Sequence, residues 1–178
     1  MTAVKILIKI FGGIVALWLV LLLIGFFLPG HYRVERSILI AAKPETIYPL
    51  VGDLRAWSKW GVWFARDPAM KITYSQVTNE VGSWSSWISK SQGDGKMTIA
   101  SIRPLEDFEY RMEFSDMGMV SRGAVTLSRA ADLSTRVTMS MEGDLGRSPL
   151  NRWFGLFMDK LIGPDFEAGL ANLKRIAG

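Results

Sequence analysis

The chain has 178 residues and a net charge of +4, with 49% hydrophobic and 21% charged residues, which excludes a wholly disordered protein. It has no cysteine and one histidine, His31, so disulfides, cysteine nucleophiles and metal sites built from several histidines are excluded within it. Lys5 and Lys9 precede the first apolar run, and the remainder is almost balanced in charge. The basic excess therefore does not indicate binding to nucleic acid.

Residues 10–30 contain no charged side chain. As a helix rising ~1.5 Å per residue, this run spans about 30 Å, the thickness of the hydrocarbon core of a bilayer. A helix satisfies its own backbone hydrogen bonds in lipid, and Pro29 and Gly30 end it. We therefore predict a transmembrane anchor over residues 1–30, in contact with the membrane through residues 10–30.

A cleaved secretory signal is the alternative reading of this segment. The apolar stretch 10–28 is longer than the ~7–15 residues of a signal core, and Leu28 occupies a position where a cleavage site needs a small residue. We favour a retained single-pass anchor in the inner (plasma) membrane. Basic residues flank the run on both sides, so the short N-terminal tail decides the orientation: the domain is expected in the periplasm or outside the cell.

The next segments predict one strand and two short helices. Residues 34–41 are rich in β-branched side chains and alternate in part, as a strand does. Pro44 then stands at a first helical position, followed by apolar residues at helical spacing. A second helical stretch over residues 54–60 ends at Gly61.

From residue 70 the hydrophobic period becomes two, which predicts strands that follow one another in hairpins. A turn is expected at 116–118. A C-terminal helix follows, with a kink or break expected at Gly163–Pro164. Short turns between successive strands predict an antiparallel sheet, and hence an α+β fold. The predicted strands cover residues 70–74, 82–91, 97–102, 108–114, 119–128 and 136–142.

Four stretches carry a resemblance to a known superfamily: residues 32–45, 54–60, 80–84 and 163–174. They resemble the helix-grip fold of the START-like (SRPBCC) superfamily, and bacterial polyketide cyclase/dehydrase-like proteins in particular. The resemblance implies a curved antiparallel sheet of about six or seven strands wrapped on a C-terminal helix, formed by residues 31–178, with two short helices after the first strand. It also implies a long cavity between sheet and helix for lipids, sterols, quinones or aromatic polyketides.

The candidate ligand-binding residues begin with a group of tryptophans. Trp57, Trp60 and Trp63 recur at every third residue, and with Phe64 they form an aromatic patch at the expected cavity mouth. They predict a gate or a lip that touches the membrane, with a cap on the core as the alternative. Trp84 lies three residues before another tryptophan, so the two point to opposite faces of a strand. We expect Trp84 to point inward.

A second group of apolar side chains is expected to line the space between the sheet and the last helix. Methionine adapts its shape and suits a cavity that takes variable apolar ligands, although it suits a filled core equally. This group comprises Tyr110, Phe114, Met139, Met141, Phe154, Phe157 and Met158.

The polar candidates are few. They are Glu142 and Asp144 near a strand end, Asp159 on the helix and Arg122 within a strand, and an acid buried in an apolar cavity has a raised pKa that suits a general acid. Asp159 is interpreted as a solvated helix edge and Arg122 as an exposed cross-strand partner. No catalytic residue, metal or cofactor is therefore assigned. Two arginines at 147 and 152 flank a helix start, where they would contact anionic lipid headgroups or be solvated.

These patterns predict membrane-anchored binding of a hydrophobic small molecule, such as a lipid, a quinone or a polyketide-like compound. A cyclase or dehydratase acting on such a ligand remains open, and it needs a buried ionisable group. A structural or protein-interaction module with a closed core also remains open, and large inward rings that fill the gap would favour it.

Overall fold

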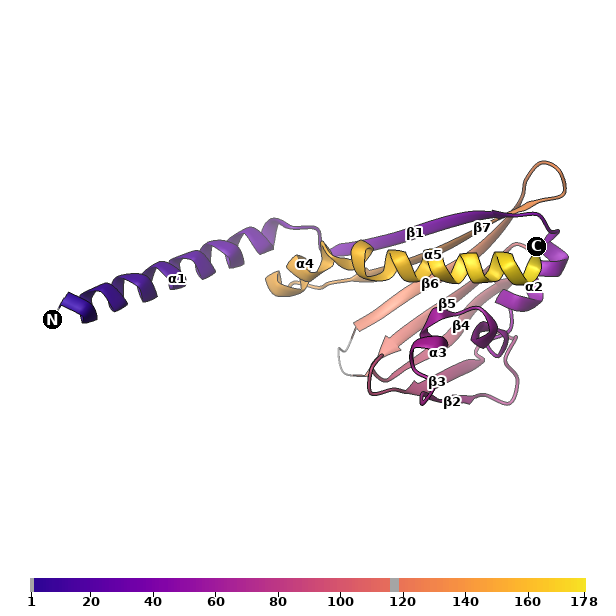
Figure 1. Cartoon of the computed structure of the whole chain (residues 1–178), viewed down its shortest axis with the longest axis horizontal. Helices are drawn as coiled ribbons and strands as arrows, with labels where there is room; N and C mark the ends of the chain where they lie inside the picture. Colours follow the sequence, from indigo (N-terminus) through magenta and orange to yellow (C-terminus); the bar gives the residue numbers. More distant parts are fainter. Residues whose placement is uncertain (1, 116–118) are drawn as a thin grey trace.

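The computed structural model describes residues 2–115 and 119–178; the turn expected at 116–118 lies outside them. Its first element, α1 (Thr2–Phe27), projects from the rest of the chain as a long arm (Figure 1). Over Val4–Phe27 this helix has a mean hydropathy of 2.7 and is almost entirely unburied. By length and composition it can cross a membrane, and a signal sequence near the N-terminus has the same properties.

The remaining chain forms one seven-stranded antiparallel sheet in the order β1-β7-β6-β5-β4-β3-β2. Successive strands from β2 to β7 pair in hairpins, and β1 joins the far edge through β7, as the alternating pattern predicts. The strands are β1 (His31–Ile40), β2 (Lys71–Tyr74), β3 (Trp84–Ile88), β4 (Gly95–Arg103), β5 (Asp107–Phe114), β6 (Met119–Arg129) and β7 (Thr135–Asp144).

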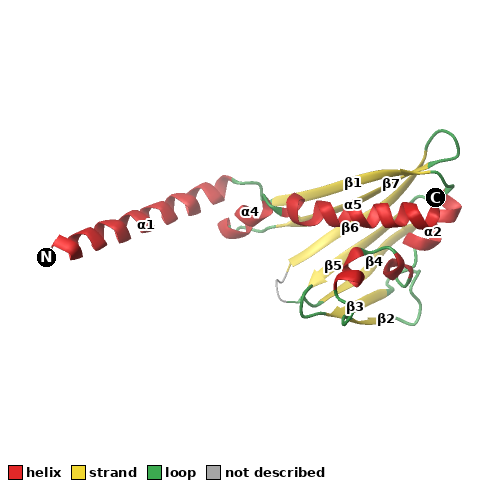
Figure 2. Ribbon diagram, in the orientation of Figure 1, coloured by secondary structure: helices red, strands yellow, loops and turns green. Residues whose placement is uncertain are grey.

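Five helical segments accompany the sheet. Between β1 and β2 stand α2 (Pro44–Val51), the 3₁₀ helix η1 (Ala56–Lys59) and α3 (Val62–Arg66). After β7 come α4 (Pro149–Gly155) and α5 (Met158–Ala177), and α5 runs along one face of the sheet (Figure 2). This arrangement confirms the predicted α+β helix-grip fold.

A kink or a break was expected at Gly163–Pro164, and the break is wrong, because α5 continues through this pair as one helix. The guanidinium of Arg36, on β1, lies against Gly163, which has no side chain to keep it away. From there it donates to Asp159 at 2.8 and 2.9 Å and to Glu167 at 2.6 Å. These bonds hold the two turns on either side of Pro164 to the edge of the sheet. The helix break lies earlier, at residues 156–157, between α4 and α5.

Aromatic rings fill the space between the sheet and the C-terminal half of α5. Trp57 packs on Trp60 and on Tyr110, with ring centroids 4.7 and 5.3 Å apart. The two indole N–H groups donate to backbone carbonyls of α2 at 2.8 Å, so neither buried nitrogen lacks a partner. Asn172 of α5 donates to the carbonyl of Trp60 at 3.1 Å. This half of the helix–sheet space is closed.

Candidate functional site

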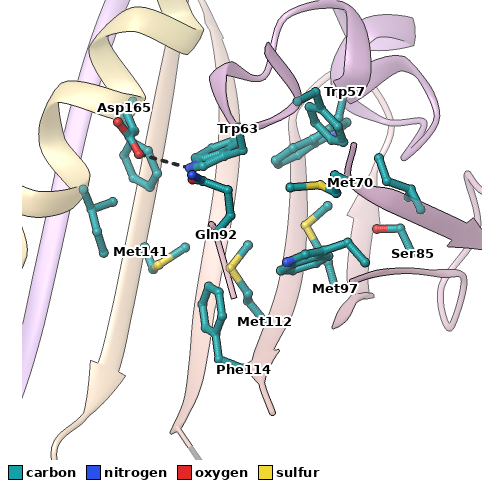
Figure 3. A pocket seen from close by; sticks show the side chains of 15 residues that line it. Trp57, Trp63, Met70, Ser85, Gln92, Met97, Met112, Phe114, Met141 and Asp165 are labelled. Carbon is teal, nitrogen blue, oxygen red and sulfur yellow. Dashed lines mark hydrogen bonds between the residues drawn. The ribbon is translucent and has the colours of Figure 1, made fainter. Parts of the chain in front are cut away.

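The other half of this space, beside the N-terminal half of α5, contains a cavity of about 210 Å³ (Figure 3). Its wall is apolar apart from Ser85, Gln92 and Asp165. The cavity is smaller than the ~300–1,000 Å³ of typical small-molecule sites. The lining residues are Trp57, Trp63, Phe64, Met70, Ile72, Ser85, Trp87, Gln92, Met97, Met112, Phe114, Met141, Ile162, Asp165 and Phe166.

Three methionines from the inner face of the sheet form much of the floor. Met97 and Met112 are direct partners across β4 and β5, and Met141 comes from β7. Side chains of a strand alternate between its two faces. Each of these methionines therefore shares its face with a buried residue two positions away on the same strand. Unbranched thioether side chains change shape at little cost, which makes this floor adaptable.

The strand edge of the cavity depends on a glycine. Trp87 covers Gly95, its partner across β3 and β4, where any side chain would meet the indole. The indole meets the ring of Phe114 edge-on, with centroids 5.9 Å apart. Trp84 lies on the opposite face, where the ammonium of Lys96 sits 5.2 Å from the centroid of its ring. The prediction that Trp84 points inward is therefore wrong, and Trp87 takes that place.

An ion pair closes one side of the cavity. The indole N–H of Trp63 donates to Asp165 Oδ2 at 3.1 Å, and Arg66 donates to the same oxygen at 2.8 Å. Arg66 also bonds the second carboxylate oxygen, and this pairing raises the pKa of its guanidinium. Asp165 belongs to α5 and the other two residues to α3, so its carboxylate ties the short helix over the cavity (Figure 3).

The structure separates the predicted site residues into three groups. Trp57, Trp63, Phe114 and Met141 line the cavity. Trp60, Tyr110, Met139 and Met158 are buried in the core cluster. Phe154 and Phe157 are 44% and 52% exposed, so the prediction that they line the space between sheet and helix is wrong. The reason is the interruption at residues 156–157, which turns α4 away from α5 and toward α1.

Several lining residues were not singled out from the sequence. Met97 and Met112 fall at the alternate positions of β4 and β5 that also hold buried residues, so the period of two indicates that they face inward. Gly95 leaves room for a ring from the neighbouring strand, which is a second signal in the sequence. Ile162 belongs to the apolar stripe of the C-terminal helix, four residues before Phe166. Gln92 and Asp165 had no such signal, because they meet the cavity only through tertiary packing. Phe64 was placed in the aromatic patch and lines the cavity with Trp63.

The polar candidates lie on the surface of the protein. Asp159 is engaged by Arg36, and Glu142 accepts from Arg33 at 3.2 Å. Arg122 stands opposite Glu142 in the β6–β7 register, as expected of a cross-strand pair. Within residues 2–115 and 119–178, no three His, Cys, Asp or Glu side chains converge to hold a metal ion.

A model of the protein family described as polyketide cyclase / dehydrase and lipid transport matches residues 31–178. A search of the curated proteins finds no match. Among solved structures, a protein from Thermobifida fusca is 18% identical, with a TM-score of 0.64 over 82% of this chain and 93% of its own. A truncated norcoclaurine synthase from Thalictrum flavum is 12% identical, with a TM-score of 0.61 over 82% and 92%.

A protein from Chromobacterium violaceum is 19% identical, with a TM-score of 0.52 over 84% of this chain and 97% of its own. At these identities the solved structures establish the shared fold. The family match confirms the resemblance that the four sequence stretches indicated.

Proposed function

Because the chain belongs to the family of polyketide cyclases, dehydrases and lipid-transport proteins, we propose that its residues 31–178 form a domain that binds a hydrophobic small molecule. Residues 1–30 anchor this domain to a membrane as a single-pass helix. The proposed location is the inner membrane, with the domain in the periplasm or outside the cell.

The observation that carries this proposal is the cavity between the sheet and α5. It is enclosed by methionine and aromatic side chains, and few polar groups interrupt its wall. Burial of apolar ligand surface is the favourable term available in such a site, at ~25 cal/mol per Å² removed from water. The volume of about 210 Å³ suits one ring system or part of an acyl chain rather than a whole phospholipid.

The position of the cavity supports a ligand that is carried by the membrane. β1 follows α1 directly, and β7 ends at Asp144, the partner of His31. Met141 lies three residues from that end, and Phe114 ends β5 on the same side of the sheet. The cavity therefore occupies the half of the domain near α1. A tether also raises the concentration of the domain at the bilayer.

A cyclase or dehydratase is the second candidate function. Of the described residues that line the cavity, Asp165 alone has an ionisable side chain. Its two oxygens already accept hydrogen bonds from Arg66 and Trp63, so the carboxylate is engaged by α3 and not by a ligand. This geometry favours binding over catalysis.

Mass spectrometry of an organic extract tests the proposal. Residues 31–178 would be purified from cells beside the variant Met112→Trp, whose larger ring would occupy the cavity. We expect a stoichiometric lipid, quinone or other apolar compound from the unmodified domain and at least tenfold less from the variant. An empty domain that also fails to bind the fluorescent fatty acid cis-parinaric acid would favour the closed structural module instead. Conversion of the extracted compound by the domain, lost in Asp165→Asn, would favour the enzyme.

A further inference from the structure

Helix α4 packs against the last two turns of α1. The indole N–H of Trp153 donates to the carbonyl of Leu21 at 2.9 Å, across 132 positions of sequence. Pro149 lies so close to Gly25 that a Cβ added at Gly25 would lie 2.7 Å from the Cβ of Pro149. The two helices therefore lie side by side at the end of the proposed membrane anchor.

An arginine completes this contact. Arg152 donates to the carbonyl of Phe26 at 2.6 Å and to that of Leu28 at 3.3 Å. The last carbonyls of a helix have no partner within the helix and carry the negative end of its dipole. The guanidinium satisfies two carbonyls at this end of α1, and its N–H groups in turn have hydrogen-bond partners at the lipid boundary.

Large apolar side chains are exposed along α4 and the start of α5. These side chains belong to α4, to its junction with α5 and to the first turn of α5, and each is at least 44% exposed: Leu150, Phe154, Leu156, Phe157 and Leu161. Large apolar side chains that gather on one exposed surface indicate a partner, and an amphipathic segment of aromatic and leucine residues suits a bilayer interface.

The depth of α4 follows from its contacts with α1. Leu21 lies six residues before Phe27, which is about 9 Å along a helix. A segment bonded to Leu21 thus lies beside the last ~9 Å of α1. If α1 spans the hydrocarbon to Leu28, then this segment lies in the outermost ~9 Å of the hydrocarbon, next to the headgroups. We propose that α4 and its junction with α5 insert into the bilayer there, as a second membrane contact beside α1; this rests on the proposed anchor.

The charge near α4 favours anionic lipid. A groove of about 970 Å³ starts at Gly30 and crosses the outer face of the sheet. Arg111 and Arg122 are direct cross-strand partners in it, although like charges in such a pair destabilise a sheet. The neighbouring Glu142 accepts from Arg33. Phosphate headgroups at this level would compensate the excess of arginines, which also includes Arg147.

Two membrane contacts restrict the orientation of the domain relative to the bilayer, whereas a single anchor would let the domain rotate about it. The anchor supplies the first contact and α4 the second, so the near end of the sheet is held at the headgroups. This gives the cavity a constant distance from the lipid that would supply its ligand.

Site-directed spin labelling of the full chain tests the insertion, because the chain has no native cysteine. Nitroxides would be placed with Phe154→Cys and Phe157→Cys in nanodiscs of phosphatidylcholine and phosphatidylglycerol. Their collision rates with oxygen and with an aqueous nickel chelate report depth. Two controls bracket them: Leu17→Cys within α1, and Leu133→Cys, an exposed residue in the turn at the far end of the sheet.

We expect the labels at 154 and 157 to favour oxygen over nickel, as the label at 17 does, and the label at 133 to favour nickel. Water-like values at 154 and 157 with a lipid-like value at 17 would overturn the insertion and leave the anchor intact. A water-like value at 17 would overturn the anchor itself. Equal depth at 157 in phosphatidylcholine alone would overturn the preference for anionic lipid.

Discussion

The two halves of the space between the sheet and α5 hold different kinds of side chain. In the half far from α1, Trp60 and Tyr110 pack against Trp57, whose ring also borders the cavity, and hydrogen bonds fix the two indoles to α2. In the half near α1, Met97 and Met112 stand at the equivalent inner positions of the same sheet, and the space is open. Rigid rings with fixed partners close one half, whereas flexible thioethers leave the other adaptable.

Both halves use glycine to seat a ring, yet the outcome differs. Tyr110 lies over Gly123 in the closed half, where burial raises the pKa of its phenol well above the usual range. Trp87 lies over Gly95 in the open half and forms a wall rather than a filling. An aromatic ring on the inner face of the sheet therefore closes the space between sheet and α5 only where rings from the helical segments pack against it, as Trp57 packs against Tyr110.

The largest expected effect comes from removing the buried ring at the border between the two halves. Trp57→Ala removes a buried ring and its hydrogen bond, and we expect the free energy of unfolding of residues 31–178 to fall by about 3–5 kcal/mol. Urea denaturation followed by circular dichroism measures this loss. Trp63→Ala, at the half-buried mouth of the cavity, is the matched control, with less than half that loss. Equal losses at the two positions would contradict the division.

The same enlargement should have different costs in the two halves. Met139→Trp adds atoms to a fully buried, filled region, and we expect a destabilisation of about 1–3 kcal/mol. Met112→Trp places its added atoms in the cavity, so its stability should stay within ~1 kcal/mol of the unmodified domain while cis-parinaric acid binds at least tenfold more weakly. Unchanged binding by Met112→Trp would show that the ligand site lies elsewhere.

A methyl group distinguishes a seated ring from a loose contact. Gly123→Ala forces Tyr110 from its place, and we expect a loss of about 1–3 kcal/mol in urea denaturation. At Gly169 in α5 an added Cβ would lie 3.5 Å from the ring of Trp60, an ordinary contact, so Gly169→Ala should be neutral or gain up to ~1 kcal/mol. Tolerance of Gly123→Ala would mean that the closed half is loosely packed.

The smallest expected effect on stability comes from the hydrogen bonds between Arg36 of β1 and Asp159 of α5. The hydrogen bonds from Arg36 lower the pKa of Asp159, so this pair stabilises the fold above the unfolded carboxyl pKa of ~3.9. That stability is lost as the pH falls from about 4 through the lowered folded pKa. Thermal unfolding measured between about pH 5 and pH 2 should show a smaller decline for Arg36→Gln than for the unmodified domain. Parallel curves would assign no role to the pair.

The sequence predicts most of the fold because strand alternation and turn residues are local signals. The period of two in β5 and β7 was sufficient to place those strands. The break near Gly163 could not be predicted correctly, because the continuity of α5 accompanies ion pairs with Arg36, more than 120 positions away.

The candidate site is less local. Trp63 was named from its spacing, but its place over the cavity depends on a hydrogen bond to Asp165, 102 positions away. Trp87, and not the predicted Trp84, points inward, and its indole fits there because its cross-strand partner is Gly95. The helical spacing of Phe154 and Phe157 predicts that they belong to the buried face of the C-terminal helix. In the structure α4 packs on α1 instead, and both side chains are exposed. Such contacts between distant segments leave no periodic trace.

A crystal of residues 31–178 under xenon pressure shows whether the half of the domain near α1 is open, because xenon enters apolar cavities without regard to ligand identity. The account predicts a xenon atom among Met97, Met112 and Met141, and no xenon between Trp57 and Tyr110. A cavity that takes up no xenon, with its methionines collapsed together, would contradict the proposal that this half of the domain is open to a ligand.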